Sequence, residues 1–148
     1  MGTLAVPQSG TVYVDTNTII YTVEEIQPYA GLLQALWIAA RNRSITVTSC
    51  EIALLETLVK PLREEKKHLE RRYRRFLTLT YEVQLVPIDR KVIEKAARLR
   101  ADCGIKTPDA LHAATALESG SELFITNDPA FRRGPGLPVA VLDDLLPT

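Results

Sequence analysis

Five short apolar stretches rich in β-branched residues constrain the fold of this chain more than any other feature. They are residues 11–15, 45–49, 83–88, 122–126 and 139–142. Each is a near-continuous apolar run without in-out alternation, as is typical of parallel strands covered on both faces. Segments with helical spacing separate them. This order predicts a three-layer α/β/α fold around a central, mostly parallel five-stranded sheet with right-handed crossovers.

The helical segments follow from apolar residues spaced three or four apart. They are residues 29–42, 50–60, 62–77, 90–102 and 107–119. Pro61 is expected to separate the second from the third, because proline lacks an N–H and clashes with the preceding turn. The 148 residues suit a single domain covering 11–148. Residues 1–10 carry no such pattern and are predicted to form a flexible N-terminal arm.

Composition excludes several classes of protein. Lysine and arginine together number 18, as do aspartate and glutamate, so this is not a globally basic nucleic-acid binder. Cys50 and Cys103 lie far apart with no second pair, which indicates neither a zinc site nor a disulfide framework. No apolar run approaches the roughly 20 residues of a membrane span, and the first residues do not form a secretory signal. A cytoplasmic location is therefore expected.

Four acidic residues follow strands or begin helices that face them. Asp15 ends the first predicted strand, and Asp128 follows the fourth by two residues. Asp109 lies in the first turn of the last predicted helix, and Glu56 lies within the helix after the second strand. Sites in parallel α/β sheets form beyond the carboxyl ends of the strands, where the strand order reverses. We therefore expect these four carboxylates to meet in one acidic pocket.

Glu56 occupies an unusual position on its helix. At 100° per residue, Ile52, Leu55 and Val59 form a predicted core-facing side, and Glu56 falls about 40° from Ile52. A glutamate at this border is partly buried, which is costly unless its charge is offset. The structural alternatives are that the side chain extends toward solvent or pairs with Lys60, one turn further on.

The three aspartates also have structural interpretations. Asp128 before Pro129 is a favourable N-cap followed by proline at the first helical position. Asp109 complements the dipole of its helix. Asp15 with Asn17 is compatible with a simple turn. Each interpretation is reasonable alone, but together they require four coincidences, whereas one acidic pocket explains all four residues.

The ligands in such a pocket would all be oxygen atoms, which predicts a hard cation, Mg²⁺ or Mn²⁺. Clustered carboxylates repel one another and raise one another's pKa unless a cation is present. Two such ions about 3.5–4 Å apart activate water and stabilise the leaving oxygen of a phosphodiester. His112, one turn after Asp109, either lines the pocket or lies in the helix core.

Four motifs in this order resemble those of the PIN domain. They are VDTN at 14–17, the helical Glu56, TPDALHAATA at 107–116 and TND at 126–128. Within that superfamily the chain is most similar to the VapC-like toxins of toxin–antitoxin pairs, from about residue 11 to 145. The resemblance implies a Mg²⁺-dependent endoribonuclease, with Mn²⁺ as a substitute ion. It also implies a homodimer and a small antitoxin partner that covers the pocket.

The resemblance also assigns roles by position. Asp15 and Asp109 would be the principal metal ligands. Glu56 and Asp128 would be the remaining catalytic acids. Asn17 and Thr126 would be supporting polar groups.

A basic stretch at residues 60–75 has eight lysines and arginines against three glutamates. It is either the solvated face of an amphipathic helix or a surface that orients RNA through its phosphates without reading sequence. The candidate phosphate contacts are Lys66, Lys67, Arg71, Arg72, Arg74 and Arg75.

Two other functions compete with the nuclease. VDTNT nearly fits the Asp-x-Asp-x-Thr motif of haloacid-dehalogenase-like phosphatases, but Asn17 replaces the second acid and no suitably placed lysine follows. A phosphate-accepting receiver domain needs paired acids after its first strand, and this chain lacks them. A catalytically inactive PIN-like module that binds RNA or protein is the alternative from another class, although the presence of all four acids weighs against it.

Overall fold

A wholly parallel, five-stranded sheet forms the centre of the computed structural model, which describes residues 2–148. The strand order is β3-β2-β1-β4-β5. The strands are β1 (Thr11–Val14), β2 (Thr46–Cys50), β3 (Gln84–Val86), β4 (Leu123–Thr126) and β5 (Val139–Val141). Each of the five predicted stretches overlaps one of them, with bounds that differ by one or two residues, so the predicted fold class is confirmed.

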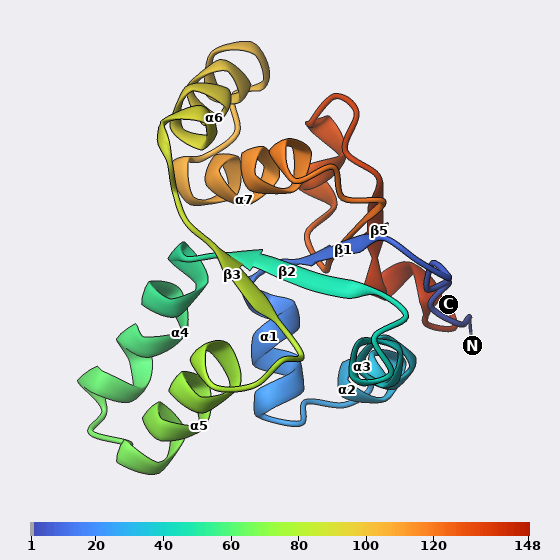
Figure 1. The fold of residues 1–148 in the computed structure, drawn as a ribbon, viewed down its shortest axis with the longest axis vertical. Helices are drawn as coiled ribbons and strands as arrows, with labels where there is room; N and C mark the ends of the chain where they lie inside the picture. Colours follow the sequence, from blue (N-terminus) through green and yellow to red (C-terminus); the bar gives the residue numbers. More distant parts are fainter. Residues whose placement is uncertain (1) are drawn as a thin grey trace.

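Helices cover both faces of the sheet (Figure 1). One layer holds α6 (Arg90–Cys103) and α7 (Thr107–Glu118). The other holds α1 (Thr16–Val23), α2 (Tyr29–Leu32), α3 (Gln34–Arg41), α4 (Ile52–Arg63) and α5 (Lys67–Thr78). Short 3-10 helices, η1 (Pro129–Arg133) and η2 (Leu142–Leu145), flank β5. Within residues 2–148, no helix has the length and apolar character that crossing a bilayer requires.

Each layer has its own hydrophobic core, and β1 contributes to both. Val12 and Val14 belong to the core beneath α1 and α4, whereas Tyr13 belongs to the core beneath α6 and α7. Successive side chains of a strand point to opposite faces, so this central strand is buried on both sides. The near-continuous apolar character of these residues follows from that burial.

The strand order reverses beside β1. The chain builds β2 and β3 on one side of β1, then crosses to place β4 and β5 on the other. Val14 at the end of β1 is in register with Ile125 of β4, so the residues that follow the two strands emerge next to each other. This reversal is where parallel α/β sheets place their ligand sites.

Helix boundaries differ from the predictions in four places. The helix predicted over 29–42 is divided into α2 and α3, and the one predicted over 62–77 begins, as α5, only at Lys67. α1 was not predicted, because its TNTIIYTV sequence is rich in β-branched residues that favour strands. Pro61 does not separate two helices but lies within α4, which continues to Arg63. Proline at that point removes the hydrogen bond that an N–H of residue 61 would donate to the Thr57 carbonyl, but the helix continues for two more residues.

Residues 2–10 have no regular secondary structure, but they are attached to the domain. Leu4 is buried in the core of the α1 and α4 layer, and the Gly2 N–H donates to the Leu145 carbonyl at 2.7 Å. Figure 1 accordingly places the two termini close together. Flexibility of this arm stays a prediction.

Candidate active site

Asp15 is buried between the tips of β1 and β4. Its side chain is the N-cap of α1, and Oδ1 accepts hydrogen bonds from the Thr18 N–H at 3.1 Å and the Thr18 hydroxyl at 2.9 Å. Oδ2 accepts from the Thr126 hydroxyl. Burial raises the pKa of Asp15, and the hydrogen bonds from Thr126 and Thr18 and the nearby His112 offset only part of that rise. Asp15 therefore caps the N-terminus of α1 and is also the buried carboxylate that follows β1.

Thr126 ties a second acid to the same point. It is fully buried at the end of β4, and its Oγ1 accepts from the Asp128 N–H at 3.0 Å. The Asp128 side chain accepts from the Ala130 N–H at 2.9 Å and caps η1, with Pro129 in the first position. The capping interpretation of Asp128 is confirmed, and the same residue also lines the cavity described below.

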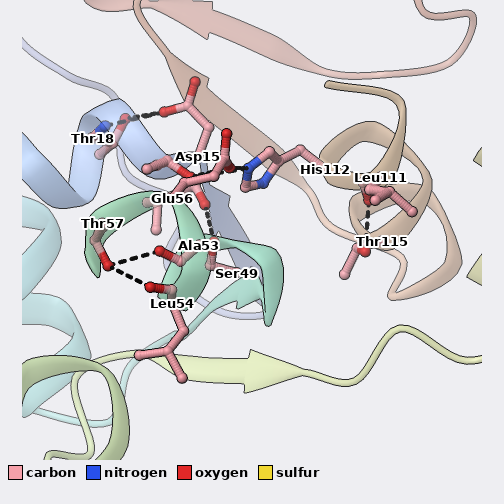
Figure 2. A network of polar contacts seen from close by, with 12 residues as sticks. Asp15, Thr18, Ser49, Ala53, Leu54, Glu56, Thr57, Leu111, His112 and Thr115 are labelled. Atoms are coloured by element: carbon pink, nitrogen blue, oxygen red, sulfur yellow. Dashed lines mark hydrogen bonds and ion pairs between the residues drawn. The ribbon is translucent and has the colours of Figure 1, made fainter. Parts of the chain in front are cut away.

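Glu56 reaches across the carboxyl edge of the sheet to the opposite helical layer. Its Oε1 lies 2.8 Å from His112 Nε2 of α7 (Figure 2). The same oxygen accepts a hydrogen bond from the Thr16 hydroxyl at 2.7 Å. Its side chain is 30% exposed. Burial raises the pKa of Glu56, but the hydrogen bonds from His112 and Thr16 outweigh this and bring the pKa below its ordinary value.

The predicted core-facing side of α4 was wrong. Leu55 and Val59 are 62% and 46% exposed, and the buried side is instead formed by Ala53, Thr57, Leu58 and Pro61. The helix is rotated relative to the prediction, and it packs against α5, α1 and α7. Glu56 is still half-buried, because it borders the buried side through Ala53, one turn earlier, and because its carboxylate is directed at His112 and not at Lys60.

All four acids line one cavity of about 210 Å³. Its walls are formed by Asp15, Thr16, Asn17, Ile20, Glu56, Asp109, His112, Asp128 and Phe131. Asn17 is exposed at the rim, whereas Thr126 lies beneath the cavity, where it holds Asp15 and Asp128. The structure therefore brings together the four predicted acids and places both supporting polar residues beside them.

The pKa of Asp109 reflects the negative charge gathered around this cavity. Burial raises its pKa, and the charges of Asp128, Glu56 and Asp15 raise it further, while His112 partly opposes them. No hydrogen-bond donor is found for its carboxylate within residues 2–148. Like charges held around one cavity favour a bound cation.

The donor set fits a hard divalent ion, because the four carboxylates provide only oxygen ligands. Within the described part of the chain, however, no three histidine, cysteine, aspartate or glutamate side chains already lie close enough to hold a metal ion. Binding therefore requires side-chain rotation. Asp109 is the acid most free to rotate, since the other three carboxylates are engaged in hydrogen bonds.

The predicted phosphate contacts lie on or just before α5, and none of them lines the acidic cavity. Arg72 donates to the Val23 carbonyl at the far end of α1 from Asp15. Arg74 pairs with Glu70 at 2.9 Å, and Lys66 lies 3.8 Å from Glu64. Lys67, Arg71 and Arg75 are exposed. Their contact with RNA stays a prediction.

Two residues of the site were missed from the sequence. Thr16 was missed because α1 was not predicted, although an aspartate such as Asp15 at the N-cap position is a signal of a helix start. Tyr13 was interpreted only as a strand residue, yet its hydroxyl lies 2.6 Å from His112 Nδ1. His112 was expected to be a pocket residue or a core residue, and it is both, since it lines the cavity and is 2% exposed.

A larger open cavity of about 770 Å³ lies at the opposite end of the sheet, near the first residues of β2 and β3. Its lining includes Arg41, Arg43, Tyr81 and Glu82, and Arg41 pairs with Glu82 at 3.3 Å. It contains no cluster of carboxylates and lies at the amino ends of the strands. The acidic cavity is the stronger candidate for chemistry.

Comparison with known proteins identifies one family. The family model for the PIN domain matches residues 12–137. No curated protein sequence matches the chain.

Solved structures with the same fold include several toxin–antitoxin assemblies. VapBC2 from Rickettsia felis, bound to a DNA fragment from its promoter, has a TM-score of 0.71 at 20% identity, covering 88% of this chain and 98% of that one. A toxin–antitoxin complex from Klebsiella pneumoniae has a TM-score of 0.64 at 25% identity, covering 88% and 96%. VapBC-5 from Mycobacterium tuberculosis has a TM-score of 0.58 at 20% identity, covering 91% and 98%.

Proposed function

The chain belongs to the PIN domain family, and on that premise we propose that it is a Mg²⁺-dependent endoribonuclease, the toxin of a toxin–antitoxin pair. Its substrate is single-stranded RNA, and its reaction is hydrolysis of internal phosphodiester bonds. Mn²⁺ substitutes for Mg²⁺. The family assignment removes the phosphatase and receiver alternatives, which leaves the inactive binding module as the competing function.

One observation carries the proposal. Asp15, Glu56, Asp109 and Asp128 come from four separate elements and line a single cavity where the strand order reverses. An inactive binding module gains nothing from this arrangement, because like charges raise the pKa of Asp109 and repel the phosphates of RNA. A hydrolase gains a cation site, which supports the active enzyme.

The side chains divide the work of holding the cation and the substrate. Asp15 and Asp109 would be the principal ligands, with Glu56 and Asp128 completing the set. Thr126 and Thr18 fix the orientation of Asp15, so little conformational entropy is lost when that carboxylate binds. Asn17, which is exposed and lines the cavity, would donate hydrogen bonds to a phosphate or ribose oxygen. When bound, a divalent cation supplies an activated water and stabilises the leaving oxygen.

An antitoxin partner is supported by the similar structures. The Klebsiella pneumoniae assembly is a toxin–antitoxin complex, and the Rickettsia felis protein is a VapBC pair on promoter DNA. We extend to this chain a small antitoxin that covers the acidic cavity, and a homodimer. The dimer should elute with a mass of twice 16.5 kDa in size-exclusion chromatography with light scattering. A monomeric mass at all concentrations would contradict it.

The decisive substrate for the proposal is a circular single-stranded RNA, because only an endonuclease can open a circle. We expect linear products with Mg²⁺ or Mn²⁺, no products with EDTA, and no cleavage of a circular DNA of the same sequence. Cleavage of the DNA circle would change the substrate class. Persistence of both circles, together with binding of the RNA, would favour the inactive module.

The toxin assignment has a separate test. Expression of the chain alone should arrest growth, and co-expression of the neighbouring reading frame should restore it. Arrest should disappear in Asp15→Asn, which retains the shape of the side chain. Growth that is unaffected by the active nuclease would restrict the proposal to a PIN ribonuclease in another role.

A further inference from the structure

We propose that Tyr13 and His112 form a hydrogen-bonded relay that positions the Glu56 carboxylate in the acidic cavity. The proposal rests on the proposed nuclease function, because Glu56 is one of the four acids of that site. Tyr13 is fully buried, and His112 is 2% exposed. Both are positioning residues that act through Glu56.

Four short contacts define the relay. The Tyr13 hydroxyl lies 2.6 Å from His112 Nδ1, and His112 Nε2 lies 2.8 Å from Glu56 Oε1. The Thr16 hydroxyl reaches the same Oε1 at 2.7 Å and lies 3.1 Å from Nε2. Tyr13 is on β1, His112 on α7 and Glu56 on α4, so the relay links the two helical layers across the sheet.

The chemistry of the three groups fixes the direction of the hydrogen bonds. An ionised carboxylate only accepts, so His112 must present a proton on Nε2. In a neutral imidazole Nδ1 is then the acceptor, and it receives the Tyr13 hydroxyl proton. Tyr13 therefore selects the tautomer in which His112 donates to Glu56.

The start of the relay is rigid. The Tyr13 ring stacks on Phe124 with centroids 4.9 Å apart and planes at 9°, and it meets the His112 ring edge-on at 75°. Phe124 in turn packs against Phe131, which lines the cavity. A hydroxyl held this way cannot follow a rotating imidazole. The imidazole is held instead, and through it one oxygen of Glu56.

The result is a division of the two Glu56 oxygens. Oε1 receives the donors from His112 and Thr16, whereas Oε2 makes no contact of this kind in the described part of the chain. The relay thus leaves Oε2 available to the cavity. His112 could act differently, as a metal ligand or a proton carrier, but both of its nitrogens are already occupied.

The first test is Tyr13→Phe, which removes only the hydroxyl and keeps the ring on Phe124. Tyr73→Phe is the matched control, because Tyr73 is also buried and donates to a glutamate, Glu24, remote from the cavity. Free Mn²⁺ is measured by electron paramagnetic resonance in a titration of each protein. We expect Tyr13→Phe to weaken Mn²⁺ binding about tenfold, as is common for groups behind a metal ligand, and Tyr73→Phe to leave it unchanged.

The second test needs neither metal nor activity. The chain has only two histidines, so ¹⁵N–¹H spectra of the imidazole rings in EDTA report His112, with His68 as an internal reference. We expect the Nε2–H tautomer of His112 in the wild type. Tyr13→Phe should shift the His112 signals without moving those of His68, which is exposed on α5.

A Glu56→Gln background separates positioning from direct action. If the relay acts through Glu56, Tyr13→Phe should have no further effect on Mn²⁺ binding in that background. A persistent effect would overturn the relay in favour of direct ligation by His112. An Nδ1–H tautomer in the wild type, or equal effects of Tyr13→Phe and Tyr73→Phe, would also overturn it. Wild-type protein that neither binds Mn²⁺ nor cleaves RNA would instead overturn the proposed function, while the spectra still report whether the relay exists.

Discussion

The hydroxyl of Thr126 donates a hydrogen bond to the carboxylate of Asp15, although 111 residues separate them in the sequence. The two residues stand at the tips of β4 and β1, which are neighbours only because the strand order reverses there. This bond fixes the buried acid at the floor of the cavity. Its loss should therefore affect both folding and cation binding.

Thr126→Val keeps the shape of the side chain but leaves Asp15 Oδ2 and the Asp128 N–H without their partner. Buried groups left unpaired cost about 1–3 kcal/mol, so the melting temperature should fall by about 2–10 °C. The increase in melting temperature that Mn²⁺ is expected to cause should also be smaller in this variant. Thr126→Ser should restore both, and Thr115→Val, which removes a buried hydroxyl within α7, should leave the Mn²⁺ response intact. If Mn²⁺ raised the melting temperature of Thr126→Val and Thr115→Val equally, Thr126 would have no specific part in cation binding.

Cation-linked stability is the second prediction. An ion that binds only the folded protein stabilises it by about 2.7 kcal/mol at 100 times its dissociation constant. Mg²⁺ or Mn²⁺ should therefore raise the melting temperature, and more at pH 8 than at pH 5, because Asp109 and Asp15 have raised pKa values and protonate first. Differential scanning fluorimetry with and without EDTA measures this. An unchanged melting temperature would count against a cation site.

The pH dependence of the metal-free protein gives the third prediction. The pKa of Asp109 is raised, so the ionised carboxylate destabilises the folded state, and that penalty disappears as pH falls through the raised pKa. Asp109→Asn should raise the melting temperature in EDTA at pH 8, with a gain that shrinks toward pH 4.

Glu56→Gln should change the melting temperature in the opposite direction to Asp109→Asn. The pKa of Glu56 is lowered, so its charge stabilises the fold above its ordinary pKa and this contribution is lost as pH falls through the lowered value. Glu56→Gln should lower the melting temperature at pH 8 and matter less in acid. Asp102→Asn, at an exposed position of α6, should leave the dependence of the melting temperature on pH as it is in the wild type. If the two site variants respond to pH alike, the opposed pKa shifts are wrong.

The basic surface of α5 gives the fourth prediction. Arg72 donates to the Val23 carbonyl and Arg74 pairs with Glu70. Arg71 and Arg75 are exposed and have no hydrogen-bond or ion-pair partner in the described residues, so they are the ones available to phosphates. Each single-strand phosphate contact changes the slope of log affinity against log salt by about 0.7, so replacing both by Gln should flatten it by about 1.4. Arg90 and Arg98 of α6, replaced together by Gln, control for the loss of charge. Equal slopes in the two double variants would make α5 an ordinary solvated surface.

Much of this architecture was predictable, because burial on both faces of a parallel sheet dictates apolar strands. The acids were predictable because strand ends converge where the strand order reverses. The rotation of α4 was not, since the small Ala53 is buried while the larger apolar Leu55 and Val59 stay exposed. The partners of Glu56 were also hidden, because Thr16 and His112 lie 40 and 56 residues from it in the sequence and meet it only through the fold.

The central claim is that the four carboxylates perform metal-dependent cleavage of RNA, and Asp109→Asn tests it most directly. Asn keeps the size of the side chain and an oxygen acceptor but removes the charge, and no hydrogen bond of Asp109 within residues 2–148 is lost. The measurement is a time course of RNA cleavage with Mg²⁺, beside a thermal melt of the same preparation and the Asp102→Asn control. We expect a folded Asp109→Asn protein whose cleavage rate falls by orders of magnitude, while Asp102→Asn cleaves as the wild type does. Full cleavage by the folded Asp109→Asn protein would contradict the account.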